Sequence, residues 1–286
     1  MQQTELSALR LSLAKYFVGH QADGLFMASL DHSPTEQLNG KTWHTSALVL
    51  SAAVEHSALA HELGRIANPQ TKKLTKWAKA NPHYRRRFHS SLMPSLDSHR
   101  VMVLAISATE TIIAENEDHF VSELGASRHY TRYLKDGRAR VSMGPVVNAN
   151  TGEKSTFDLP GNQGPMVVFI AHYLRRMHQE MQIALSLRAP MHVTWNFLAD
   201  KPPGGSKGPF DQALSMLLGL ANPRGSLRWG YFLEGDTVET DLLADNIAGL
   251  LNEIMLVPKR YASPVRQPST NGAGFFYWER WMKDSG

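Results

Sequence analysis

Met191-His192-Val193-Thr194-Trp195-Asn196-Phe197-Leu198 is the stretch that decides the fold class, because apolar and polar residues alternate along it. Alternation with a period of two predicts a β-strand with one buried face. Apolar residues recur at helical spacing in the stretches 166–187, 209–221 and 240–255, and residues 227–233 are a further strand candidate. Because helices and strands alternate along this half of the chain, the sequence predicts a mixed α/β protein.

The first half of the chain predicts a helix, a β-hairpin and further helices. Residues 4–17 favour a helix, and the apolar runs 25–30 and 43–50 flank a turn-rich segment and predict a β-hairpin. Helical patterns follow at 52–66 and 70–80, and Asn81-Pro82 predicts the end of the second. Shorter stretches complete the expectations: 87–92 is extended, 97–108 fits a helix or a strand, 111–114 favours a strand, and 136–164 fits an irregular excursion or a hairpin.

Composition excludes several classes of protein. The chain has 286 residues, of which 42% are hydrophobic and 20% charged, enough apolar material for a core. It has no cysteine, which excludes disulfides, thiolate zinc sites and a cysteine nucleophile. No apolar run approaches the roughly 18 residues that a membrane helix needs. The N-terminus lacks a signal-peptide pattern. We therefore expect a soluble cytoplasmic protein.

Positive charge is concentrated in residues 65–100. This segment holds nine basic residues and one acid, whereas the whole chain has a net charge of +4. Lys72, Lys76 and Lys79 would share one face of a helix. Such a run is commonly a solvated helix face, but it also attracts polyanions. The candidate nucleic-acid contacts are Lys72, Lys73, Lys76, Arg85, Arg86 and Arg87.

Four aspartates are candidate ligands for a divalent cation. Asp31 and Asp200 each follow a predicted strand, where open α/β sheets place their ligand-binding residues. Asp241 and Asp245 are four residues apart on the last predicted helix and would share one face. Asp31 and Asp200 can also be turn residues, and Asp241 can simply favour the start of a helix that Thr240 caps. Asp245 differs, because an aspartate inside a helix among apolar neighbours is costly unless it is paired or binds a metal ion. Carboxylates that converge on Mg²⁺ or Mn²⁺ would suit phosphodiester hydrolysis.

Three motifs resemble those of the DUF3800 family, which has a ribonuclease H-like fold. Members begin with a strand that ends in Asp-Glu-Ser-Gly, and here the corresponding stretch is Ser29-Leu30-Asp31-His32-Ser33-Pro34. Members end with a helix carrying Gln-Leu-Ala-Asp, two hydrophobic residues and Ala, and here Asp241-Leu242-Leu243-Ala244-Asp245-Asn246-Ile247-Ala248-Gly249 is similar. Residues 87–92 resemble a middle motif. In the opening motif His32 replaces the glutamate and Pro34 the glycine.

The resemblance implies one ribonuclease H-like domain over residues 1–286, a mixed sheet flanked by helices. It would carry a basic helical insertion at about 65–100, an irregular excursion at about 136–164 and an aromatic tail at about 258–286. It also implies a metal-dependent nuclease of a bacterial antiphage or mobile-element context. The implied site residues are the metal ligands Asp31, Asp200 and Asp245, Asp241 as a further ligand, His89 as a substrate or proton-transfer residue, and more weakly Glu110.

Two other functions compete with the nuclease. The altered opening motif and the aromatic residues Phe275–Trp281 would suit a catalytically inactive subunit that binds nucleic acid or a protein partner. A small-molecule enzyme is less well supported, since no dinucleotide-binding, phosphate-binding-loop or nucleophile-elbow motif is present.

Overall fold

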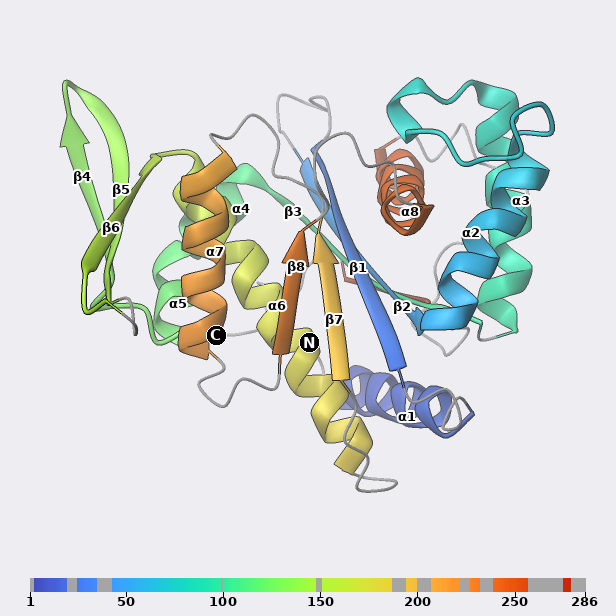
Figure 1. Ribbon diagram of the computed structural model, residues 1–286, viewed down its shortest axis with the longest axis horizontal. Helices are drawn as coiled ribbons and strands as arrows, with labels where there is room; N and C mark the ends of the chain where they lie inside the picture. The colour runs from blue at the N-terminus through green and yellow to red at the C-terminus, as the bar shows by residue number, and fades with distance from the viewer. Residues whose placement is uncertain are drawn as a thin grey trace. The chain divides into compact units, whose positions relative to one another are not determined.

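The order of strands and helices was taken from a computed structural model (Figure 1). The structure describes residues 3–19, 25–34, 43–98, 100–147, 151–186, 194–199, 207–221, 227–231, 239–256 and 275–278. The chain divides into two units. Unit 1 is made of Met1–Thr109, Glu180–Lys201 and Leu227–Gly286, and unit 2 of Glu110–Gln179 and Pro202–Ser226.

Unit 1 is built on a six-stranded sheet with the order β8-β7-β1-β2-β3-β9. β1 and β2 form the predicted antiparallel hairpin, and β2 also pairs antiparallel with β3. The pairs β1–β7, β7–β8 and β3–β9 are parallel, so β2 alone runs against the other described strands of this sheet. The mixed α/β prediction is therefore confirmed. The bounds are β1 Leu25–Pro34, β2 Trp43–Ala52, β3 Met102–Thr109, β7 Thr194–Ala199, β8 Leu227–Tyr231 and β9 Phe275–Trp278.

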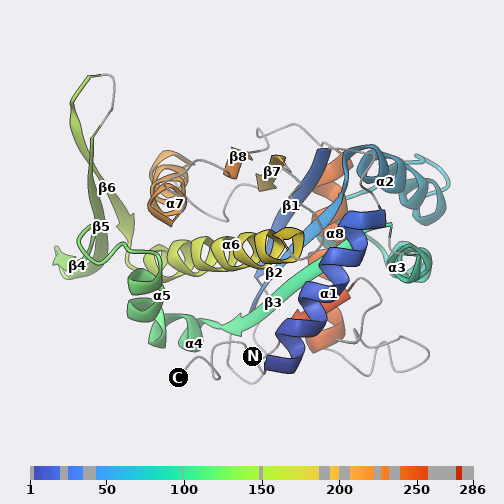
Figure 2. The same cartoon turned by 90° about the horizontal axis from the view of Figure 1, so that it is seen from below.

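Three helices cover one face of this sheet (Figures 1 and 2). They are α2 (Ala53–Ala67), α3 (Pro82–Asp97) and α8 (Glu239–Leu256), and the predicted helices at 52–66 and 240–255 are thereby confirmed. Alternate residues of β2 and β3 point into the core between the sheet and these helices, and Val49 and Val103 are fully buried there. Phe88 of α3 and Ile247 of α8 complete the same core.

The predicted helix at the N-terminus is also present, as α1 (Gln3–Gly19). Its buried Tyr16 accepts a hydrogen bond from the Ala52 backbone amide and donates one to the Arg100 carbonyl. Arg10 of the same helix pairs with Glu180, which is buried. Side chains therefore anchor α1 to the end of β2, to the segment before β3 and to Glu180.

The predicted helix at residues 70–80 is wrong. Residues 69–71 form a turn, and only Trp77–Lys79 are helical, as the short 3₁₀ helix η2. Lys72 has a φ of 59°, a left-handed conformation that interrupts an α-helix. The backbone groups of this segment find partners outside it: Asn246 donates to the Thr75 carbonyl, and Asp245 accepts from the Trp77 amide. Tertiary partners thus replace helical hydrogen bonds.

Three shorter expectations are corrected as well. Asn81-Pro82 begins a helix instead of ending one, because Asn81 accepts a hydrogen bond from the Tyr84 amide and Pro82 occupies the first helical position. Residues 87–92 are therefore part of α3 and not extended. Residues 111–114, expected as a strand, lie in α4 (Glu110–Glu115), and the ambiguous stretch 97–108 resolves mainly into β3.

Unit 2 contains a three-stranded antiparallel sheet, β4-β5-β6 (Figure 2). This sheet includes most of the segment 136–164, for which the sequence predicted either an irregular excursion or a hairpin. Asp136 and Gly137 both have positive φ, the requirement of a two-residue turn between twisted strands. The helices predicted at 166–187 and 209–221 are also present, as α6 and α7. The bounds are α5 Glu117–Glu123, β4 Tyr130–Lys135, β5 Arg138–Val147, β6 Lys154–Pro160, α6 Gln163–Ser186, which continues into unit 1, and α7 Lys207–Ala221.

Candidate nucleic-acid interface

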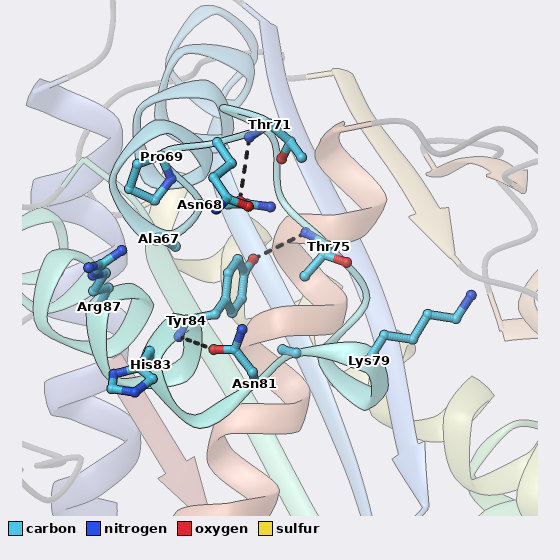
Figure 3. A pocket seen from close by; sticks show the side chains of 12 residues that line it. Ala67, Asn68, Pro69, Thr71, Thr75, Lys79, Asn81, His83, Tyr84 and Arg87 are labelled. Atoms are coloured by element: carbon cyan, nitrogen blue, oxygen red, sulfur yellow. Dashed lines mark hydrogen bonds between the residues drawn. The ribbon is translucent and has the colours of Figure 1, made fainter.

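A pocket of about 540 Å³ lies in the basic segment of unit 1, between the end of α2 and the start of α3. Figure 3 shows the Tyr84 ring at its centre, with Arg87 and His83 on one side and Lys79 on the other. Its lining contains no carboxylate. The full lining is Ala67, Asn68, Pro69, Gln70, Thr71, Thr75, Lys79, Ala80, Asn81, His83, Tyr84 and Arg87.

Hydrogen bonds hold the shape of the pocket wall. The Thr75 amide donates to the Tyr84 hydroxyl at 3.2 Å, and the Tyr84 amide donates to Oδ1 of Asn81 at 2.9 Å (Figure 3). Burial raises the pKa of Tyr84 to about 12, and the negative charge of Asp245 acts in the same direction. The phenol is therefore neutral at physiological pH, and the charges on the pocket lining come from its basic side chains.

One face of α8 holds the basic segment in place. Asp245 accepts from the Trp77 amide at 2.7 Å, and Glu253 accepts from the Trp77 indole at 3.1 Å. Gly249 lies between them along the helix, and an added Cβ would come within 2.2 Å of the Trp77 ring. Only glycine therefore lets the indole pack this closely against α8. These residues recur every four positions, which explains why the helix carries them on one side.

Arg85 belongs to the scaffold of this interface. It forms an ion pair with Glu253, donates to the Trp77 carbonyl at 2.9 Å, and lies 5.0 Å above the Trp77 ring. A guanidinium that is engaged in this way is less available to a phosphate. Of the six cations expected to contact nucleic acid, Arg85 is the one that the structure ties into the protein.

Six further cations of the segment are exposed and form no ion pair with any residue that the structure describes. Arg100, by contrast, pairs with Glu55 and Glu62. A terminal guanidinium nitrogen of Arg86 lies 3.1 Å from Nδ1 of His83. The lysines lie on the irregular segment between α2 and α3 and not along one face of an α-helix. Unpaired exposed cations add to the attraction for a polyanion, since no internal carboxylate cancels their charge. These residues are Lys72, Lys73, Lys76, Lys79, Arg86 and Arg87.

The structure describes two of the four candidate metal ligands in detail. Asp31 lies within β1 and is only 6% exposed. Its preceding residue, Leu30, pairs with Ala199, the last residue of β7. Asp200 follows Ala199 in the sequence but lies outside the described residues, as does the side chain of Asp241.

Asp245 is half-buried on α8, which packs against β1 and β2. One carboxylate oxygen accepts the hydrogen bond from Trp77, so at least part of its function is structural. Among the described side chains, no three of His, Asp and Glu lie close enough together to hold a metal ion. Asp200 is not one of those side chains.

The two weaker candidates lie in different surroundings. His89 is buried in α3, and burial lowers the pKa of its imidazole, so the ring is neutral at physiological pH. It does not line the pocket. Glu110 is exposed at the first position of α4, in unit 2. The structure therefore associates neither residue with the basic pocket.

Sequence reasoning missed the neutral polar lining of the pocket. Asn68, Thr75 and Tyr84 carry no motif of their own, and their convergence depends on the irregular course of the chain between α2 and α3. One signal was available, because Asn followed by Pro is also a helix-start pattern. Had Asn81-Pro82 been interpreted that way, Tyr84 and Arg87 would have been placed on one face of the first turns of a helix.

Comparisons of the chain with protein-family models, with curated proteins and with solved structures gave no match. Within the described part of the chain, none of the helices combines the length and the apolar character needed to cross a membrane.

Proposed function

We propose that the protein is a metal-dependent nuclease with a ribonuclease H-like fold. The observation that carries the proposal is the pairing of Leu30 with Ala199. Asp31 and Asp200 each follow one of these two paired residues in the sequence, and open α/β sheets bind ligands beyond the carboxyl ends of neighbouring parallel strands. Mg²⁺ and Mn²⁺ prefer carboxylate ligands of this kind.

The order of the central strands supports the fold assignment. The order is β3-β2-β1-β7-β8, with only β2 antiparallel to its neighbours, and it agrees with the ribonuclease H-like fold that we propose. The helix that carries Asp245 packs on the central strand, β1. In this assignment β9 is an added strand at the β3 edge, and the segment between α2 and β3 supplies the basic surface.

The basic surface and the acids would have separate functions in cleavage. Lys72, Lys73, Lys76, Arg86 and Arg87 would bind the phosphate backbone, while the acids would position the ions that activate water and stabilise the leaving oxygen. Arg85 would act indirectly, by holding Trp77 and the adjacent chain against α8.

A second candidate function is binding of nucleic acid without cleavage. The hydrogen bond between Asp245 and the Trp77 amide favours it, because a carboxylate that caps a turn has less capacity for a metal ion. In this case the basic surface would bind polynucleotide with the same affinity in the presence and absence of divalent cations.

Cleavage assays separate the two functions. Labelled single- and double-stranded DNA and RNA are incubated with the protein and Mg²⁺ or Mn²⁺, and Asp31→Asn and Asp245→Asn are compared with Asp118→Asn, which replaces an exposed aspartate of unit 2. The nuclease predicts that only the first two variants lose cleavage. Binding that needs no metal, together with no cleavage of any of these substrates, would instead support the second function.

A further inference from the structure

The exposed face of the β4-β5-β6 sheet is a second surface with the chemistry of a nucleic-acid contact. Residues 128–147 contain five basic residues and one acid, Asp136. The surface belongs to unit 2, so its function can be argued without reference to the pocket in unit 1. The five cations are Arg128, Arg132, Lys135, Arg138 and Arg140.

Strand pairing divides these residues between the two faces of the sheet. Tyr133 pairs directly with Arg140, and Lys135 with Arg138, so all four side chains belong to one face. Arg132 pairs with Val141 and belongs to the other face. The burial pattern agrees with this division, since Val141 and Met143 are fully buried whereas Lys135 and Arg138 are exposed.

The two faces have different partners. On the inner face, Arg132 forms an ion pair with the buried Glu117, which also accepts a hydrogen bond from Tyr130. On the outer face, Lys135, Arg138 and Arg140 form no ion pair with any described residue. The acid Asp158 does occur on this face, because it pairs with Ser142, but it lies on the next strand and away from the turn. The turn itself holds one acid, Asp136, so these three cations still leave a net positive charge near it.

We propose that this outer face binds single-stranded nucleic acid, with a base stacked on Tyr133 and the flanking phosphates contacted by Lys135, Arg138 and Arg140. Many proteins bind single-stranded nucleic acid through an aromatic side chain that lies among basic residues, because every base has a face that can stack on the ring. Tyr133 is half-buried and pairs directly with Arg140, so the two residues are neighbours on this face. A duplex would offer the same phosphates but no free base face.

Binding of a fluorescein-labelled single-stranded oligonucleotide, measured by fluorescence anisotropy with the full chain, tests the proposal. Tyr133→Ala should raise the Kd by about 5- to 150-fold, the equivalent of one lost stacking contact. Arg138→Gln with Arg140→Gln should reduce the dependence of log Kd on log salt by about 0.7 per phosphate contact. The control Lys154→Gln removes an exposed cation at the start of β6, which pairs with Val147 at the end of β5 away from the turn. This variant should change neither the Kd nor its salt dependence by much.

A second readout locates the contact directly. An oligonucleotide that contains 5-iodouracil should crosslink under ultraviolet light to the peptide that contains Tyr133. A duplex of the same length should bind the parent and Tyr133→Ala equally. Equal single-strand affinities for the parent and Tyr133→Ala, or crosslinks that never map to β4 or β5, would overturn the proposal. Neither result depends on cleavage, so failure here is distinct from failure of the proposed nuclease.

Discussion

Replacing Gly64 of α2 by alanine tests how the basic loop is held against the protein. An added Cβ would lie 2.8 Å from the Leu74 amide nitrogen and 2.9 Å from the Lys73 carbonyl carbon. Both neighbours are backbone atoms, so no rotation of a side chain can relieve the clash. The loop that carries Lys72 and Lys73 would have to move away from the helix.

The magnitude follows from two opposing effects. Alanine in a helix interior ordinarily stabilises by about 0.5–1 kcal/mol relative to glycine. Forcing extra volume into a packed contact costs about 1–3 kcal/mol. The net of the two ranges is a destabilisation of unit 1 by up to about 2.5 kcal/mol. We also expect weaker nucleic-acid binding, because the loop lysines are displaced.

Urea unfolding provides the assay, and Gly219→Ala is the matched control. Gly219 lies in α7, where an added Cβ meets no atom within 4 Å, so this variant should gain about 0.5–1 kcal/mol. If Gly64→Ala gained stability as the control does, the close packing of residues 73–74 on α2 would be wrong.

Three further predictions concern charge, capping and pH. Replacing Lys72, Lys73 and Lys76 together by glutamine should reduce the dependence of log Kd on log salt by about 2–3, at 0.7–0.9 per phosphate contact. The control Lys15→Gln on α1 should leave this dependence as it is. An unchanged dependence in the triple variant would contradict the interface. Asp245→Ala should lower the free energy of unfolding by about 1.5–3 kcal/mol, because the Trp77 amide loses its charged acceptor. Asp245→Asn should lower it by less than about 1 kcal/mol, because an amide oxygen can still accept the hydrogen bond. Equal losses for the two variants in urea unfolding would refute the capping function. Burial, with the charges of His119, Arg175 and Arg176, lowers the pKa of His172 to about 3. The neutral imidazole therefore contributes to stability above pH 6.5, and this contribution is lost as the pH falls from 6.5 towards 3. A His172 resonance that titrates near pH 6.5 in a nuclear magnetic resonance pH series would exclude this.

Local patterns predicted much of unit 1 correctly. The alternation and apolar runs of β1, β2, β7 and β8 are properties of the strands themselves, and the helical periodicities of α1, α2 and α8 are equally local. Because these patterns belong to the residues of each element itself, they are sufficient to define it.

The errors occur where distant residues determine the local structure. Residues 70–80 have a helical charge pattern, but Asp245 and Asn246, about 170 positions further along, bind the backbone at Trp77 and Thr75. The pocket depends on the same long-range contacts, so its lining could not be predicted from spacing. By contrast, the cations at 72–76 and 86–87 were correctly expected to be exposed, because exposure of a dense basic run follows from the cost of burying charge.

The metal-dependent cleavage of a labelled polynucleotide by the parent and by Asp31→Asn is the measurement that tests the nuclease most directly. We predict cleavage that requires Mg²⁺ or Mn²⁺, stops on chelation, and falls in Asp31→Asn by more than the roughly 10- to 100-fold expected for loss of an outer-shell partner, while thermal unfolding changes little. Equal cleavage rates for the two proteins, or no cleavage with either ion, would contradict the account.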